Sequence, residues 1–146
     1  MNEVSREARE KAAIPTAAMF GMWVAEKTRN RDTDQFGHVN HAAMATLLEG
    51  ARIELVFAPE LEAETAGIDL LVVRLTLNFH KELRAPGRVR IGSRVTRIGS
   101  SSFDVAQAIF DGEDCIASAE AVCVLLDRRT RKPSPVTQRM RAHLLA

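Results

Sequence analysis

The chain has 146 residues, of which 46% are hydrophobic and 27% are charged, and its formal net charge is +1. This length and apolar content suit one compact domain and exclude a disordered protein, while the near-zero charge argues against a nucleic-acid partner. The longest apolar run, residues 121–126, is too short to cross a bilayer, and the charged N-terminal residues do not resemble a signal peptide. We therefore expect no membrane partner and a cytoplasmic protein.

The N-terminal residues predict a helical extension that precedes the main domain. Residues 3–13 are rich in Ala, Glu, Lys and Arg, and Pro15 follows them. These residue types favour a helix, which proline ends. We assign residues 1–20 to this extension and residues 21–146 to a single domain.

The first half of that domain predicts a strand, a turn-rich segment and a long helix. Residues 22–29 are extended in pattern, and residues 30–40 are rich in turn-forming side chains. Residues 41–57 carry apolar side chains every four positions, which is typical of a helix with one buried face. Pro59 ends this helix. The apolar positions are Ala43, Leu47, Ala51 and Leu55.

The second half changes to the period of two that is typical of strands. The predicted strands are residues 73–80, 88–95, 103–109 and 115–126. Small residues form one face of the last strand and allow a helix to lie close: Ala117, Ala119, Ala121 and Cys123. The pattern predicts an α+β fold with one long helix on a curved sheet of meandering antiparallel strands. The uncovered face and edges of such a sheet favour a homo-oligomer.

Chemically reactive residue types concentrate just before the long helix. Asp32 is expected to cap a helix or close a turn. Six residues separate Asp34 from the predicted helix start at His41, so capping explains Asp34 less well. Asp34, His38 and His41 are potential metal ligands, but their spacing and the absence of a nearby Cys are poor for a metal site. We predict no metal and no cofactor.

This segment resembles a known family. The run RNRDTDQFGHVNHAAMATLLEGAR, residues 29–52, is similar to the signature of 4-hydroxybenzoyl-CoA thioesterases: Asp-x-Asp, two residues, Gly, then a helix ending in Glu-x-Ala-Arg. The segments NFHKEL, RVTRIGSSSF and LDRRTRKPSP also match strands and a tail of that family. The resemblance implies the hotdog fold, a homodimer or homotetramer, and hydrolysis of an acyl-CoA substrate without a metal.

The resemblance also implies roles for individual residues. Asp34 matches the catalytic carboxylate, which acts as nucleophile or general base; the sequence leaves both routes open. His41 matches the helix-start position whose N–H faces the thioester carbonyl, and Glu49 matches an acid that borders the site. The predicted substrate-binding residues also include Gly37, His38, Val39, Asn40 and Met44. From their positive charge, Arg97 and Arg128 are predicted to bind the phosphate groups of CoA.

The chain departs from the family at the helix, and two other functions stay open. Met44 and Leu47 stand where relatives often carry aromatic residues, which favours an aliphatic acyl group. The first alternative is a hotdog dehydratase or hydratase on acyl-CoA or acyl-carrier-protein substrates, in which His38 pairs with Asp34. The second is a non-catalytic acyl-binding protein.

Overall fold

The computed structural model describes residues 13–146, so the helix predicted over residues 3–13 lies outside them except for Ala13, which is not helical. The elements are η1 (Ala17–Met19), β1 (Met22–Thr28), η2 (Asn30–Asp32), α2 (His41–Val56), η3 (Pro59–Leu61), α3 (Glu62–Thr65), β2 (Ile68–Phe79), β3 (Gly87–Ile98), β4 (Ser102–Asp111), β5 (Asp114–Asp127) and α4 (Gln138–Leu144). None of the helices among these residues combines the length and apolar character that crossing a membrane requires.

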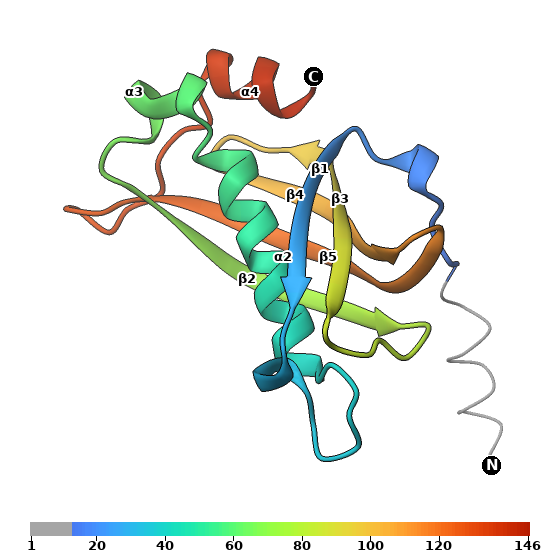
Figure 1. Cartoon of the computed structure of the whole chain (residues 1–146). Coiled ribbons are helices and arrows are strands. Elements are labelled where there is room, and N and C mark those ends of the chain that lie inside the picture. The colour runs from blue at the N-terminus through green and yellow to red at the C-terminus, as the bar shows by residue number, and fades with distance from the viewer. Residues whose placement is uncertain (1–12) are drawn as a thin grey trace, which may run out of the picture.

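The five strands form one antiparallel sheet in the order β1-β3-β4-β5-β2. The helix α2 crosses one face of this curved sheet (Figure 1). The predicted α+β architecture is therefore confirmed. The meander is confirmed for β3, β4 and β5 but wrong for β2, which pairs with β5 at the far edge of the sheet. Residues 80–86 therefore connect β2 to a strand that is not its neighbour.

The helix α2 packs its apolar side chains on the inner face of the sheet. Asn40 caps the N-terminus of this helix, and the buried residues of the helix are Met44, Leu48, Ala51, Arg52, Leu55 and Val56. The small side chains predicted for β5 are all buried beneath it: Ala117, Ala119, Ala121 and Cys123. Because these side chains are short, the helix axis can approach the sheet closely.

The segment before β1 covers part of the outer face of the sheet, the face opposite α2. Phe20 is buried there with Ala108 and Phe110 of β4. Gly92 of β3 makes room for this ring, since a Cβ at that position would lie 2.7 Å from Phe20. Phe20 thus anchors the chain across the outer face before β1 begins.

Strand β2 is an edge strand with exposed apolar side chains on both faces. These are Leu71, Val72, Val73, Leu75 and Phe79, and Val73 is 62% exposed. Its other edge has no strand beside it among the described residues. An open edge with contiguous apolar surface is a common site of association between chains.

Candidate active site

Asp34 lies at the start of a tight loop, residues 33–40, which we call the site loop. Its Oδ1 accepts hydrogen bonds from the backbone N–H groups of Phe36 (2.8 Å) and His38 (3.2 Å). Gly37, with a φ of 81°, takes the left-handed conformation that this turn needs and that glycine adopts without strain. The Oδ2 atom of Asp34 accepts no hydrogen bond from residues 13–146. One carboxylate oxygen is thus held and the other is available.

The local electrostatics keep the Asp34 carboxylate ionised. Desolvation raises its pKa, but hydrogen bonds from the backbone N–H groups of His38 and Phe36, and the charges of His38 and His41, together outweigh it. The pKa of Asp34 therefore lies below its ordinary value. An ionised carboxylate is the form required of a nucleophile or a general base.

The site loop is fixed against the connection between β2 and β3. Val39 donates its backbone N–H to the Leu83 carbonyl (2.7 Å), and His38 and Arg84 form an isolated antiparallel bridge. The His38 Nε2 lies 3.2 Å from a carboxylate oxygen of Glu82. Glu82 lies in the NFHKEL segment, but the sequence does not identify it as a site residue, because only the tertiary structure brings it to His38.

The start of α2 lies directly after the site loop. Asn40, predicted to bind substrate, uses its side-chain oxygen to cap the helix by accepting from the Ala43 N–H (2.7 Å). His41 is the first helical residue, and its ring stacks on Phe79 of β2 with centroids 4.5 Å apart. The N–H groups of His41 and Ala42 find no hydrogen-bond acceptor among the described residues. They remain free donors at the positive end of the helix dipole.

Asp32 has the structural role expected of it, at a different turn. Its Oδ2 accepts from the Arg29 N–H (2.7 Å), which closes η2 instead of capping α2. The two carboxylates of the Asp-x-Asp pair therefore differ: that of Asp32 closes the turn before the loop, and that of Asp34 lies within it.

Two predicted site residues on α2 lie in contrasting environments. Met44 is 3% exposed and packs in the core between α2 and the sheet. Glu49 is exposed, next to the buried Arg52. Burial lowers the pKa of Arg52, which hydrogen-bonds to Gln107 (2.9 Å), and the charge of Glu49 opposes that shift. Glu49 therefore does not point into the sheet.

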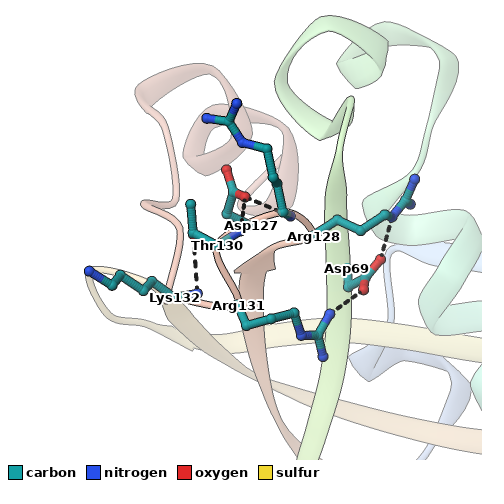
Figure 2. A network of polar contacts seen from close by, with 7 residues as sticks. Asp69, Asp127, Arg128, Thr130, Arg131 and Lys132 are labelled. Carbon is teal, nitrogen blue, oxygen red and sulfur yellow. Dashed lines mark hydrogen bonds and ion pairs between the residues drawn. The ribbon is translucent and has the colours of Figure 1, made fainter.

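The two predicted phosphate-binding arginines are each ion-paired with an aspartate. Arg97 pairs with Asp104 (3.1 Å). Arg128 lies in residues 127–132, which we call the basic turn, where Arg128 and Arg131 donate to the two oxygens of Asp69 at 2.9 and 2.7 Å (Figure 2). These two hydrogen bonds lower the pKa of Asp69.

The basic turn and the site loop lie at opposite ends of β2. Asp69, near its start, binds the basic turn, while Phe79, at its end, stacks on His41. The ten residue steps between them span about 33 Å at 3.3 Å per residue. Within one chain the structure therefore does not bring Arg128 together with Asp34.

Neither of two cavities found among the described residues belongs to the predicted site. Their volumes are about 550 and 590 Å³, and no residue between 30 and 49 lines either of them. Within residues 13–146 no group of three or more His, Cys, Asp or Glu side chains is arranged to hold a metal ion. The site loop is instead an open surface beside the exposed end of β2.

Comparison with known proteins places this fold and loop in a family. Residues 28–144 match the model of the thioesterase-like superfamily, and the chain belongs to that superfamily. The match is to the superfamily as a whole, so the narrower resemblance to 4-hydroxybenzoyl-CoA thioesterases stays a prediction.

Individual relatives agree with this assignment. The chain is 31% identical over 118 residues to the chloroplastic acyl-acyl carrier protein thioesterase ATL2 of Arabidopsis thaliana, a match that covers 75% of this chain and 63% of the relative. The PA5185 protein of Pseudomonas aeruginosa superposes with a TM-score of 0.81 at 26% identity, covering 89% of this chain and 93% of that one. The probable thioesterase YbaW of Escherichia coli gives 0.72 at 24%, covering 85% and 96%. The hotdog fold is thereby confirmed, and the family supports a thioesterase.

Proposed function

We propose that this protein hydrolyses an acyl-CoA thioester to the free acid and CoA. The main observation in support is the environment of the Asp34 carboxylate. One of its oxygens accepts two backbone N–H groups, and the other accepts no hydrogen bond from the described residues. The carboxylate lies close enough to His41, the first residue of α2, for the charge of His41 to lower its pKa. A nucleophile or base is thus positioned beside a group of backbone donors.

The start of α2 supplies the electrophilic half of the site. Negative charge develops on the carbonyl oxygen when a thioester is attacked, and preorganised N–H donors stabilise it. Since Asn40 takes the Ala43 N–H, the free N–H groups of His41 and Ala42 are the donors for that oxygen. The helix dipole adds to their effect.

Two routes lead from this arrangement to products. In the first, Asp34 removes a proton from water, whose oxygen attacks the carbonyl carbon as the C–S bond breaks. In the second, Asp34 attacks directly, CoA leaves as the thiolate, and water hydrolyses the resulting anhydride. Both routes require the ionised carboxylate that the lowered pKa of Asp34 provides.

The active protein in this proposal is a homodimer joined through β2, or a homotetramer made of two such dimers. Two β2 strands related by a two-fold axis run antiparallel, so the start of one lies beside the end of the other. This pairing covers the exposed apolar residues of β2 and brings the basic turn of one protomer to the site loop of its partner. Arg128 then binds the CoA phosphates of a thioester held at the partner's Asp34. A monomeric mass by analytical ultracentrifugation at micromolar concentration would contradict this assembly.

One observation favours a second candidate, a dehydratase or hydratase. Such enzymes use a His and an acid for proton transfer, and His38 lies 3.2 Å from Glu82. The His–acid pair of this structure is thus His38 with Glu82. The Asp34 carboxylate contacts His38 through the His38 backbone N–H and not through the imidazole ring. Hydration of an enoyl-CoA that survives Asp34→Asn and is lost in Glu82→Gln would identify this second activity.

Thiol release from a panel of acyl-CoA esters tests the proposed hydrolase. A thiol-reactive chromophore suits the assay, because the only cysteines, Cys115 and Cys123, are buried and burial raises the pKa of both, that of Cys123 to about 11. Asp34→Asn keeps the turn, since an amide oxygen also accepts N–H groups, and should abolish most turnover. Asp32→Asn, the same change two residues away, is the matched control and should retain it. No thiol release from any ester by the wild type would refute the proposal.

A further inference from the structure

A second group of reactive side chains lies on the outer face of the sheet. The Oγ of Ser118, in β5, is 2.8 Å from the Nε2 of His80, which follows β2. Phe79 stacks on His41 at the start of α2, so the alternation of side chains directs its neighbours Asn78 and His80 to the face opposite α2. The proposed thioesterase site uses none of Asn78, His80 and Ser118.

Ser118 opens onto a cavity. The cavity has a volume of about 550 Å³, within the range of small-molecule sites, and Ser118 and Asn78 both line it. Asn78 lies directly opposite Ser118 in the pairing of β2 with β5, so the two side chains are neighbours on the same face of the sheet. Apolar side chains of the segment anchored by Phe20 form one wall: Ile14, Pro15, Met19 and Phe20.

The Ser118–His80 contact has the geometry of an activated nucleophile. A hydroxyl becomes nucleophilic when a base lies within hydrogen-bond distance, about 2.6–3.2 Å. Burial lowers the pKa of His80, so its imidazole is neutral at pH 7. In the tautomer with the proton on Nδ1, the Nε2 atom accepts the hydroxyl hydrogen of Ser118. The base is therefore in its reactive form and in contact with the nucleophile.

We infer that Ser118 and His80 form a second, nucleophilic site that takes small carboxylic esters with an apolar group in the outer-face cavity. Ser118 Oγ attacks the ester carbonyl carbon and its proton passes to His80 Nε2. The bond from that carbon to the alcohol oxygen breaks, and the departing alcohol takes the proton. Water then attacks the acyl-serine, His80 accepts a proton from it and returns this proton to Oγ, and the free acid leaves. The Asn78 amide, one of the polar groups that line the cavity, is the donor we assign to the carbonyl oxygen.

A fluorophosphonate probe on the full-length protein tests this site directly. It should add once per chain, at Ser118, as seen by intact mass and peptide mapping, and heat-denatured protein should give no adduct. Ser118→Ala should abolish the adduct, and His80→Gln should slow labelling by about 100-fold, the low end of a general-base contribution. Ser134→Ala, which alters another half-buried serine that has no side-chain hydrogen bond to a histidine within residues 13–146, is the matched control and should label normally.

The two activities of the protein should separate in the same variants. Asp34→Asn should lose thioester hydrolysis and still label at Ser118, while Ser118→Ala should keep thioester hydrolysis and lose hydrolysis of p-nitrophenyl acetate. Circular dichroism spectra that match the wild type confirm that each variant is folded, and Ser118→Cys provides a second, nearly isosteric variant. Absence of a Ser118 adduct on native protein after prolonged exposure, or equal labelling rates in wild type and folded His80→Gln, would overturn the inference.

Discussion

The site loop and the basic turn are built on the same local device and carry opposite chemistry. In both, one Asp oxygen accepts two backbone N–H groups. Asp34 accepts those of Phe36 (2.8 Å) and His38 (3.2 Å). Asp127 accepts those of Arg129 and Thr130, each at 2.8 Å (Figure 2). In both, backbone hydrogen bonds help to lower the pKa of the aspartate. A held aspartate with a lowered pKa therefore does not by itself mark an active site.

The surroundings of the two aspartates differ. Asp34 is followed by Gln35, Phe36 and Gly37, none of which is ionisable, and it lies beside the free N–H groups at the start of α2. Asp127 is followed by cations: Arg128, Arg129, Arg131 and Lys132. The first turn thus presents an anion next to donors for a carbonyl oxygen, and the second presents cations suited to phosphate groups. The proposed reaction needs both, one at each end of the CoA ester.

The largest difference between the two turns should appear when the same substitution is made at both aspartates. Asp34→Asn and Asp127→Asn each keep an oxygen that accepts the backbone N–H groups and remove one charge. If Asp34 is the nucleophile or base, its variant should lose about 100-fold or more in kcat on acyl-CoA esters, whereas Asp127→Asn should leave kcat nearly unchanged. Steady-state kinetics with matched thermal unfolding curves check this. Similar losses in the two variants would remove Asp34 from the chemistry.

The sequence predicts the helix and the inner face of the sheet well because both depend on local periodicity. Apolar spacing and Pro59 define α2, and the small residues of β5 identify the surface beneath it. The position of β2 beside β5 depends on pairing between distant residues, which no local pattern reveals. The spacing of Cys115 and Cys123 likewise predicts that both side chains lie on the same face of β5. A register shift between Ile109 and Phe110 instead places Cys115 on the outer face, opposite to Cys123.

Residues of the candidate site can be predicted where they belong to a continuous sequence motif. They cannot be predicted where the contact joins residues that are distant in the sequence. The motif identifies Asp34 and His41 because both lie in one continuous segment. The contact of Glu82 with His38 and that of Asp69 with Arg128 join residues 44 and 59 positions apart, so only the folded chain reveals them. The side chain of Asn40 caps α2, which is a structural role. A resemblance to a family does not distinguish this role from substrate binding.

Removing Arg128 should weaken binding of the nucleotide end of the substrate without affecting the chemistry. Hydrogen bonds to charged groups contribute about 1.5–3 kcal/mol, and the proposed contact between Arg128 and a CoA phosphate is exposed, so its contribution should be at the low end of this range. KM for acyl-CoA should therefore rise about 10-fold in Arg128→Ala, with kcat unchanged. The same acyl group on N-acetylcysteamine, which lacks the nucleotide, should show no change. Arg139→Ala, which removes an exposed arginine paired with Glu64, is the control. An unchanged KM would exclude Arg128 from CoA binding.

Mixed dimers then test whether the two turns meet across the subunit interface. In a hybrid of Asp34→Asn and Arg128→Ala chains, one site combines an intact Asp34 with the partner's intact Arg128. The hybrid should therefore recover the wild-type KM at about half the kcat per dimer, since one of its two sites is complete. If both turns act within one chain, no such site forms and the raised KM persists. Co-expression with two affinity tags isolates the hybrid for kinetics.

A substitution on α2 should act on the acyl end of the substrate alone. Leu47 is half-buried on this helix, whereas Met44 is buried in the core, where a larger ring would overpack it. Leu47→Phe should raise the ratio of kcat/KM for benzoyl-type over aliphatic esters by about two- to tenfold, because aromatic pairs contribute about 0.5–1.5 kcal/mol beyond area burial. Competitive inhibition by free CoA should not change. A wild type that already prefers an aryl ester would contradict the predicted aliphatic pocket.

The smallest effect is expected at Asp69, which holds the basic turn in place. Its pKa is lowered by hydrogen bonds from Arg128 and Arg131, so the folded state favours the ionised form. The resulting stabilisation is fully present above the ordinary pKa of 3.8 and is lost as the pH falls through the lower folded-state value. Asp69→Asn should therefore lower Tm slightly at pH 7, and the difference from wild type should shrink steadily below pH 3.8. Asp111→Asn, which removes the charge of an exposed aspartate at a hairpin end, is the matched control. A Tm difference for Asp69→Asn that persists at low pH would mean that its carboxylate charge does not stabilise the turn, and that the two arginines are held there by other contacts.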